Sequence, residues 1–310
     1  MSVKALQSII AADIGSTFTH ACLIDQVAGI SRLVAVAESP TTANESGGDV
    51  SIGLARAIKQ LEHAVQRPLL DDHDELITPE RASGAGVDAL VAISSAARPL
   101  RCVIIGLTDD LSVESATQVC LSSNVLVAKT VPLGARMRRW DEQTISELHA
   151  DPPDLILMVG GVDAGPVAPL QSAAQLLCTI YQQMEPSQRP RMLFAGNQEI
   201  LSPLFTVSVV NNVRPSVDKE STGELQRELL ELYERVQLLR VPGLAQLAER
   251  CASPIVATYT ALATLWRFMA QRNESAQGIL GVDVGGATTQ VTLVHDDVCE
   301  LAIAAGMGTS

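Results

Sequence analysis

The stretch Ala12-Asp13-Ile14-Gly15-Ser16-Thr17 returns late in the chain as Val282-Asp283-Val284-Gly285-Gly286-Ala287-Thr288-Thr289. Each copy is an apolar strand that ends in Asp-x-Gly, followed by a turn of small residues and a second strand. The second aspartate follows the first by 270 positions. One such motif alone is most simply a tight hairpin turn, but two matching copies indicate two halves of one binding site.

The residue types in these turns suit phosphate binding. Glycine lets backbone N–H groups approach a phosphate, and Ser or Thr hydroxyls add donors. An aspartate at the strand end can hold Mg²⁺, usually through water, and the ion bridges to phosphate oxygens. We therefore expect two facing hairpins that grip one nucleotide. The predicted binding residues are Asp13, Gly15, Ser16, Thr17, Asp283, Gly285, Gly286, Ala287 and Thr288, with Asp13 and Asp283 as the metal ligands.

Composition excludes several other classes of protein. The 310 residues are enough for about two domains, and 47% of them are hydrophobic, which excludes disorder as the main state. A net charge of −13 argues against general DNA or RNA binding, and only 3% aromatic residues argues against single-strand binding. We expect no membrane span, since no apolar run reaches about 18 residues. The start does not resemble a signal peptide, and six scattered cysteines without C-x-x-C favour a cytoplasmic protein.

The first part of the chain reads as an antiparallel meander followed by a helix. Strands are expected at 8–14, 19–25 and 32–37, and a helix over 50–65. From Val87 onward, short apolar strands alternate with helical patterns, which is typical of a parallel sheet in βαβ units. The expected strands are 89–93, 102–105, 125–128, 155–159, 192–195 and 207–210; the expected helices are 113–121, 142–149 and 167–184.

The last third is expected to hold two further helices and a second meander. A charged block over 218–239 reads as a peripheral helix, and the apolar 255–269 as a buried one. Residues 278–304 repeat the opening pattern of strand, turn, strand, turn and strand. Since three strands alone make a poor domain, we expect the natural protein to continue beyond Ser310.

Several segments together resemble the actin, Hsp70 and sugar-kinase superfamily of ATPases. In closer detail the chain resembles the MutL or GlmL family, which is associated with adenosylcobalamin-dependent glutamate mutase and is distinct from the mismatch-repair protein of that name. The two Asp-x-Gly motifs are specific to the superfamily, and the other segments to the family. The segments that carry the resemblance are 12–19, 93–97, 160–165, 194–197, 211–215 and 283–289.

This resemblance implies an α/β fold. It implies an actin-like (ribonuclease H-like) ATPase domain with an inserted Rossmann-like α/β unit and a truncated second actin-like domain. The corresponding boundaries are 1–100 and 216–275 for the first actin-like domain, 101–215 for the inserted unit and 276–310 for the start of the second.

The resemblance also implies a Mg-ATP-binding protein, an ATPase-type activator or chaperone of a cobalamin-dependent mutase. ATP and Mg²⁺ are the implied cofactors, and a mutase or an assembly protein the implied partner. The alternative is a non-catalytic actin-like scaffold of the cell-division or pilus-assembly type, with a sugar kinase third. Hydrolysis stays open because Gln290 stands where the second motif commonly has Asp, and His20 where the first often has Lys or Arg. No catalytic residue is identified.

Other motifs have ordinary structural interpretations. The loops at 160–165 and 196–197 follow strands, and read either as plain βα turns or as a ligand or partner site at the carboxyl edge of a doubly wound sheet. Ser94-Ser95 either satisfies a turn or reaches the phosphate cleft. The basic cluster 136–140 reads as a solvated loop or a partner contact, and the five histidines lack metal-ligand spacing.

Overall fold

We analysed a computed structural model of the 310-residue chain. It describes residues 6–309 apart from 44, 46, 47, 108, 134–146, 149, 164, 166, 167, 201–206, 274–277, 296 and 297. The chain divides into two compact units. One contains residues 1–98, 234–302 and 306–310, and the other contains residues 99–233 and 303–305. The domain boundaries expected from the sequence stay a prediction.

The first unit is built on a five-stranded sheet in the order β10-β4-β1-β2-β3. Strands β1 (Ile9–Ile14), β2 (Phe18–Val27) and β3 (Ile30–Pro40) form the predicted antiparallel meander. Strand β4 (Ala89–Ser94) runs parallel to β1, and the short β10 (Val256–Ala257) runs parallel to β4. The mixed α/β class predicted from the sequence is confirmed.

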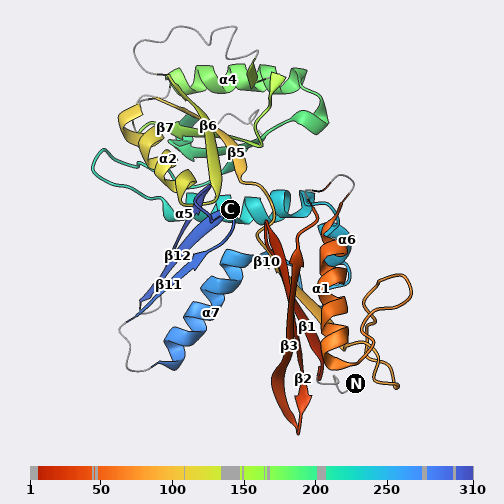
Figure 1. The fold of residues 1–310 in the computed structure, drawn as a ribbon. Helices are drawn as coiled ribbons and strands as arrows, with labels where there is room; N and C mark the ends of the chain where they lie inside the picture. The colour runs from red at the N-terminus through yellow and green to blue at the C-terminus, as the bar shows by residue number, and fades with distance from the viewer. Residues whose placement is uncertain are drawn as a thin grey trace, which may run out of the picture. The chain divides into compact units, whose positions relative to one another are not determined.

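Helix α1 (Val50–Val65) covers one face of this sheet (Figure 1). Asp49 caps it by accepting a hydrogen bond from the Ser51 amide at 2.7 Å, and the chain leaves it through Gln66 in the left-handed region, at φ 54°. Alternate residues of β1 point to α1, so Ile10, Ala12 and Ile14 are buried while the residues between them are half-exposed.

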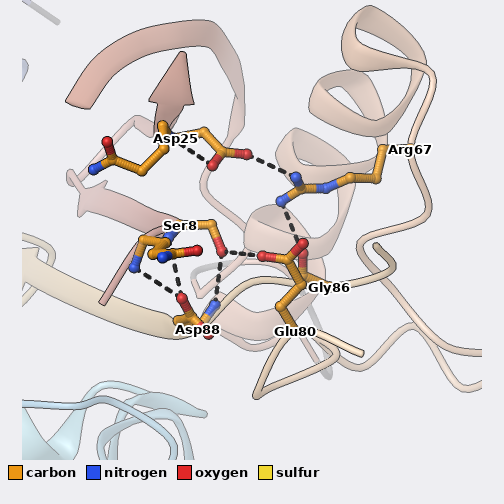
Figure 2. A network of polar contacts seen from close by, with 8 residues as sticks. Ser8, Asp25, Arg67, Glu80, Gly86 and Asp88 are labelled. Atoms are coloured by element: carbon orange, nitrogen blue, oxygen red, sulfur yellow. Dashed lines mark hydrogen bonds and ion pairs between the residues drawn. The ribbon is translucent and has the colours of Figure 1, made fainter. Parts of the chain in front are cut away.

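A polar network joins the long loop after α1 to the residue before β1 and to the end of β2 (Figure 2). Arg67 donates to an Asp25 carboxylate oxygen at 2.7 Å and to the Gly86 carbonyl at 2.8 Å. The buried Ser8 hydroxyl donates to Glu80 at 2.8 Å and accepts from the Asp88 amide at 3.0 Å. These bonds satisfy polar groups that the loop carries against the sheet.

The rest of the first unit comprises α6 (Leu244–Ala248), α7 (Thr258–Arg272) and a three-stranded sheet of β11 (Ile279–Val284), β12 (Thr288–His295) and β13 (Val298–Ala305). Figure 1 shows α7 alongside β11 and β12. The expectation of a buried helix over 255–269 is wrong. Only Tyr259 and Ala263 of α7 are buried, while Phe268 and Met269 are exposed, because α7 packs along one side only.

The second unit is a five-stranded sheet in the order β6-β5-β7-β8-β9, and every neighbouring pair is parallel. The predicted parallel pairing of these strands is therefore confirmed. Figure 1 shows helices on both faces of the sheet. The strands are β5 (Leu100–Gly106), β6 (Val125–Pro132), β7 (Leu155–Gly160), β8 (Arg191–Gly196) and β9 (Ser208–Val209); the helices are α2 (Glu114–Leu121), α4 (Ala168–Gln183) and α5 (Gly223–Leu232).

The predicted peripheral helix over 218–239 needs correction. Its α-helical part is α5, followed by a π turn (Tyr233–Gln237) and a 3₁₀ turn (Leu238–Arg240). Leu225, Leu229 and Leu232 are buried, because their spacing of four and three residues forms one apolar stripe on an otherwise charged helix. Most of the helix expected over 142–149 lies outside the described residues. Among the described residues, no helix is long and apolar enough to span a membrane.

The network around Ser8 gives a stability prediction. Ser8→Ala removes the hydroxyl that the Asp88 amide donates to and leaves a Glu80 oxygen without that donor. We expect a loss of about 1 kcal/mol or more in the free energy of unfolding, because two partly buried groups lose a partner. The exposed Ser31, which accepts from Gln26, is the matched control, and Ser31→Ala should change stability by less than about 0.5 kcal/mol. Equal effects of the two substitutions in denaturant titrations would contradict this.

Candidate functional site

The two Asp-x-Gly motifs form hairpins with the same register. Asp13 pairs with His20 across β1 and β2, and Asp283 pairs with Gln290 across β11 and β12. The Gly15 amide donates to the Phe18 carbonyl at 2.9 Å, and the equivalent Gly285–Thr288 bond is also 2.9 Å. Each hairpin therefore turns over two residues, Ser16-Thr17 in the first and Gly286-Ala287 in the second.

The strand that follows each hairpin also holds its turn in the same way. In the first copy, the Thr41 amide donates to the Thr17 carbonyl at 2.8 Å, and in the second the Gly306 amide donates to the Ala287 carbonyl at 2.9 Å. The Gly15 carbonyl accepts from the Thr41 hydroxyl at 2.9 Å. The Gly285 carbonyl accepts from the Thr309 amide at 3.1 Å. The repeat detected in the sequence is thus a repeat of hydrogen-bonding geometry.

Ser94, which the sequence left between a turn role and a phosphate role, supports the first hairpin from behind. Its buried hydroxyl donates to the Ile14 carbonyl at 2.9 Å and accepts from the Ala96 amide at 3.1 Å. The Ser95 amide donates to the same carbonyl at 3.0 Å. Both serines thereby fix the backbone immediately after Asp13.

The carboxylate of Asp13 lies in an environment that disfavours its charged form. Burial raises its pKa above the ordinary value of 3.8, and the negative charge of Asp283 adds to the rise. A hydrogen bond from the Thr258 hydroxyl at 3.1 Å and the nearby His20 act in the opposite direction. Asp283 thus contributes, as the smallest of these influences, to the electrostatic environment of Asp13.

Residues of this kind fit a hydrated magnesium ion. Within the part of the chain that the structure describes, no group of three or more His, Cys, Asp or Glu side chains is arranged to hold a metal directly. Mg²⁺ does not need such a group, since it keeps several waters and is held by one or two carboxylates together with substrate phosphates. Asp13 and Asp283 are the carboxylates that would hold such an ion, and a cation would oppose the raised pKa of Asp13.

Asp13 also borders a cavity of about 660 Å³ on the sheet face opposite α1. The walls are mainly small or apolar side chains, among them Ala11, Cys22 and Val91. His20 and Glu38 also line it, and both are exposed, with His20 Nδ1 and Glu38 Oε2 3.5 Å apart. The carboxylate thus stands where an apolar surface meets a polar edge, as is common in ligand sites.

Sequence reasoning missed two contributors to this site. Thr258 begins α7 and reaches Asp13 from 245 positions away, and Thr41 holds the first turn. The signal for Thr41 was a Pro-Thr-Thr run directly after a strand. Thr258 had no signal of its own, because only the parallel pairing of β10 with β4 brings it to the end of β1.

The described residues of the loop after β7 are held by hydrogen bonds. Gly160 and Gly161 have φ of 123° and 71°, which favour glycine. The buried Asn212 amide donates to the Gly161 carbonyl at 2.8 Å and to Asp163 at 2.9 Å, and Asn197 donates to the Val162 carbonyl at 3.1 Å. Asn197 and Asn212, which lie in two of the segments quoted above for the resemblance, thus support this loop. Ala164, Pro166 and the basic cluster 136–140 lie outside the described residues.

Comparison with solved structures finds distant similarities. The chain is similar to acetone carboxylase in a nucleotide-free structure, with a TM-score of 0.44 and 11% identity over 98% of this chain and 48% of that one. It is also similar to diol dehydratase-reactivating factor in its nucleotide-free form, with a TM-score of 0.33 and 9% identity over 97% and 72% of the two chains.

Comparison of sequences is more decisive. Protein MutL of Clostridium tetanomorphum is 24% identical over 298 residues, which cover 92% of this chain. The match spans 57% of that relative's own length. A family model described as MutL protein matches residues 9–306 and includes both Asp-x-Gly hairpins. The chain belongs to the MutL protein family.

Proposed function

We propose that this protein binds Mg-ATP at its two Asp-x-Gly hairpins and uses it to act as an ATPase-type activator or chaperone of a cobalamin-dependent mutase. The observation that carries the nucleotide part is the shared geometry of the hairpins. Both have the same register, the same two-residue turn and an aspartate at the same position. One hairpin is an ordinary turn, whereas two equivalent ones, each with an aspartate at the same position, suit a polyanionic phosphate chain and its cation.

Each part of the site has a distinct task in this proposal. Backbone amides of the two turns bind phosphate oxygens, helped by the hydroxyls of Ser16, Thr17 and Thr288. Asp13 and Asp283 hold the water shell of the cation, which would supply the positive charge that an acidic protein lacks. The hydrogen bonds of Thr41 and Ser94 in the first turn, and of Gly306 and Thr309 in the second, keep the turns in shape, so little ordering is needed when nucleotide binds.

The sheet order supports an actin-like, ribonuclease H-like fold for the first unit. Three antiparallel strands are followed by two parallel ones, and the meander repeats in β11–β13. On this proposal the parallel sheet of the second unit is the inserted Rossmann-like domain, and β11–β13 begin the second actin-like domain. The cytoplasmic location stays a prediction.

Membership of the MutL family supports the mutase partner, because the sequence resemblance links that family to glutamate mutase. We propose that nucleotide binding changes the relation between the hairpins and that the partner responds to this change. The test is reactivation: an inactivated adenosylcobalamin-dependent mutase should recover activity with the protein, Mg-ATP and fresh cofactor together. Recovery that needs neither the protein nor Mg-ATP would contradict the activator role.

Removal of either aspartate charge tests the nucleotide site. Asp13→Asn and Asp283→Asn should each weaken Mg-ATP binding at least about tenfold, equivalent to about 1.4 kcal/mol, because each removes one of the charges that hold the cation. Isothermal titration calorimetry on the full-length protein measures this. Asp74→Asn is the control, since Asp74 is an exposed carboxylate paired with Lys59. Equal affinity of wild type and all three variants would contradict a nucleotide site at the two hairpins.

The raised pKa of Asp13 predicts that the site costs stability. The native state holds the Asp13 proton more tightly than the unfolded state, so stability falls as pH rises from 3.8 through the raised pKa. Asp13→Asn should therefore raise the unfolding midpoint at neutral pH, by about 2–4 °C for each kcal/mol gained. Below pH 3.8 this gain should vanish, because Asp13 is then protonated in both states. A variant that is less stable than wild type at neutral pH would show that the charge is stabilised by the fold.

A further inference from the structure

The first turn of α7 contacts both hairpins. The Thr258 hydroxyl donates to Asp13 Oδ1 at 3.1 Å, which joins the turn to the end of β1. The next residue, Tyr259, accepts from the Gln290 side-chain amide through its carbonyl at 3.4 Å, which joins it to β12. Gln290 is the partner of Asp283 in the second hairpin. Two consecutive residues of one helix thus reach the strands of both aspartates.

This turn is itself held by a third element. One carboxylate oxygen of Glu234 accepts from the Ala257 amide at 3.0 Å and from the Thr260 hydroxyl at 2.7 Å. Ala257 is the N-cap residue of α7, and its own side chain makes no capping bond. Glu234 therefore anchors the first residues of the helix from a distant part of the chain, independently of either hairpin.

Two further contacts keep α7 in register with the second hairpin. Gln290 is buried and its amide also donates to the Thr292 hydroxyl at 3.0 Å, so its orientation is set from within β12. Two turns along α7, the Trp266 ring lies so close to Gly281 that a Cβ there would be 2.3 Å from the indole nitrogen. Gly281 stands two residues before Asp283. The helix is therefore packed directly against β11, the strand that carries Asp283.

We propose that Thr258 is a positioning residue of the nucleotide site: its hydroxyl holds the Asp13 carboxylate in the orientation that meets the hydrated cation. The inference rests on the proposed function. The bond to Thr258 engages Oδ1 and would leave Oδ2 available to the water shell of a cation. Without the bond, the carboxylate can rotate about its terminal torsion, and its distance to the cation is no longer set by α7.

Substitution of Thr258 separates this role from a purely structural one. Thr258→Val keeps the shape of the side chain and removes the donor, and should weaken Mg-ATP binding about tenfold, as expected for a hydrogen bond to a charged group. ATP binding without Mg²⁺ should be unchanged, because the hydroxyl acts through Asp13 on the cation. Thr258→Ser keeps the donor and should restore Mg-ATP affinity. Thr264→Val is the matched control, since its exposed hydroxyl donates to the Thr260 carbonyl of the same helix, away from Asp13.

The double variant Asp13→Asn/Thr258→Val completes the test. If Thr258 acts through Asp13, the second substitution should add little to the loss caused by the first. Titration calorimetry of the full-length protein distinguishes the failures. A wild-type protein that binds no Mg-ATP would overturn the proposed function. Normal wild-type binding with an unchanged affinity in Thr258→Val, or a loss that Thr258→Ser does not repair, would overturn the positioning inference alone.

Discussion

Burial disfavours the charged form of Asp13, and the neighbouring hydrogen bonds hold this carboxylate and its turn in place despite that cost. The carboxylate ends an apolar strand, where loss of water raises its pKa, and only the Thr258 hydroxyl and His20 offset this. A protein that merely needed a hairpin there could use a neutral residue at lower cost. Retaining an acid in this setting makes sense if a cation completes its environment. The supports of the turn from Ser94 and Thr41 then serve to keep an unfavourable group in a defined place.

The two hairpins are copies, yet opposite faces of them are covered. In the first sheet, Ile10, Ala12 and Ile14 are buried beneath α1; their counterparts 270 positions on, Leu280, Val282 and Val284, are 66%, 55% and 55% exposed. The reverse holds for the other face. Ala11 borders an open cavity, whereas its counterpart Gly281 is closed off by Trp266 of α7. One helix thus covers each sheet, and each leaves open the face that the other copy buries.

Local patterns predicted what depends on local sequence. The meanders, α1 and the parallel sheet follow from alternation and from apolar spacing, and the hairpin turns from Asp-x-Gly. Two helices were misjudged because burial depends on neighbours: α5 buries three leucines under a charged exterior, and α7 exposes Phe268 and Met269 despite its apolar composition. Thr258 could not be found, since its contact with Asp13 arises only when β10 pairs beside β4.

The structure gives a packing explanation for Gln290, which departs from the usual aspartate of the motif. Taken from the sequence, a glutamine in place of the usual aspartate weakens the case for hydrolysis. In the structure its side chain is buried, and it donates to Thr292 and to the first turn of α7. His20 holds the equivalent place in the first hairpin, but there the face is open and the ring pairs with Glu38 at the rim. An aspartate at 290 would bring a second buried charge next to a carbonyl, which cannot donate to it. A glutamine can donate both bonds and so fits the contact between β12 and α7. Its presence at this position is explained by helix packing, and needs no catalytic role.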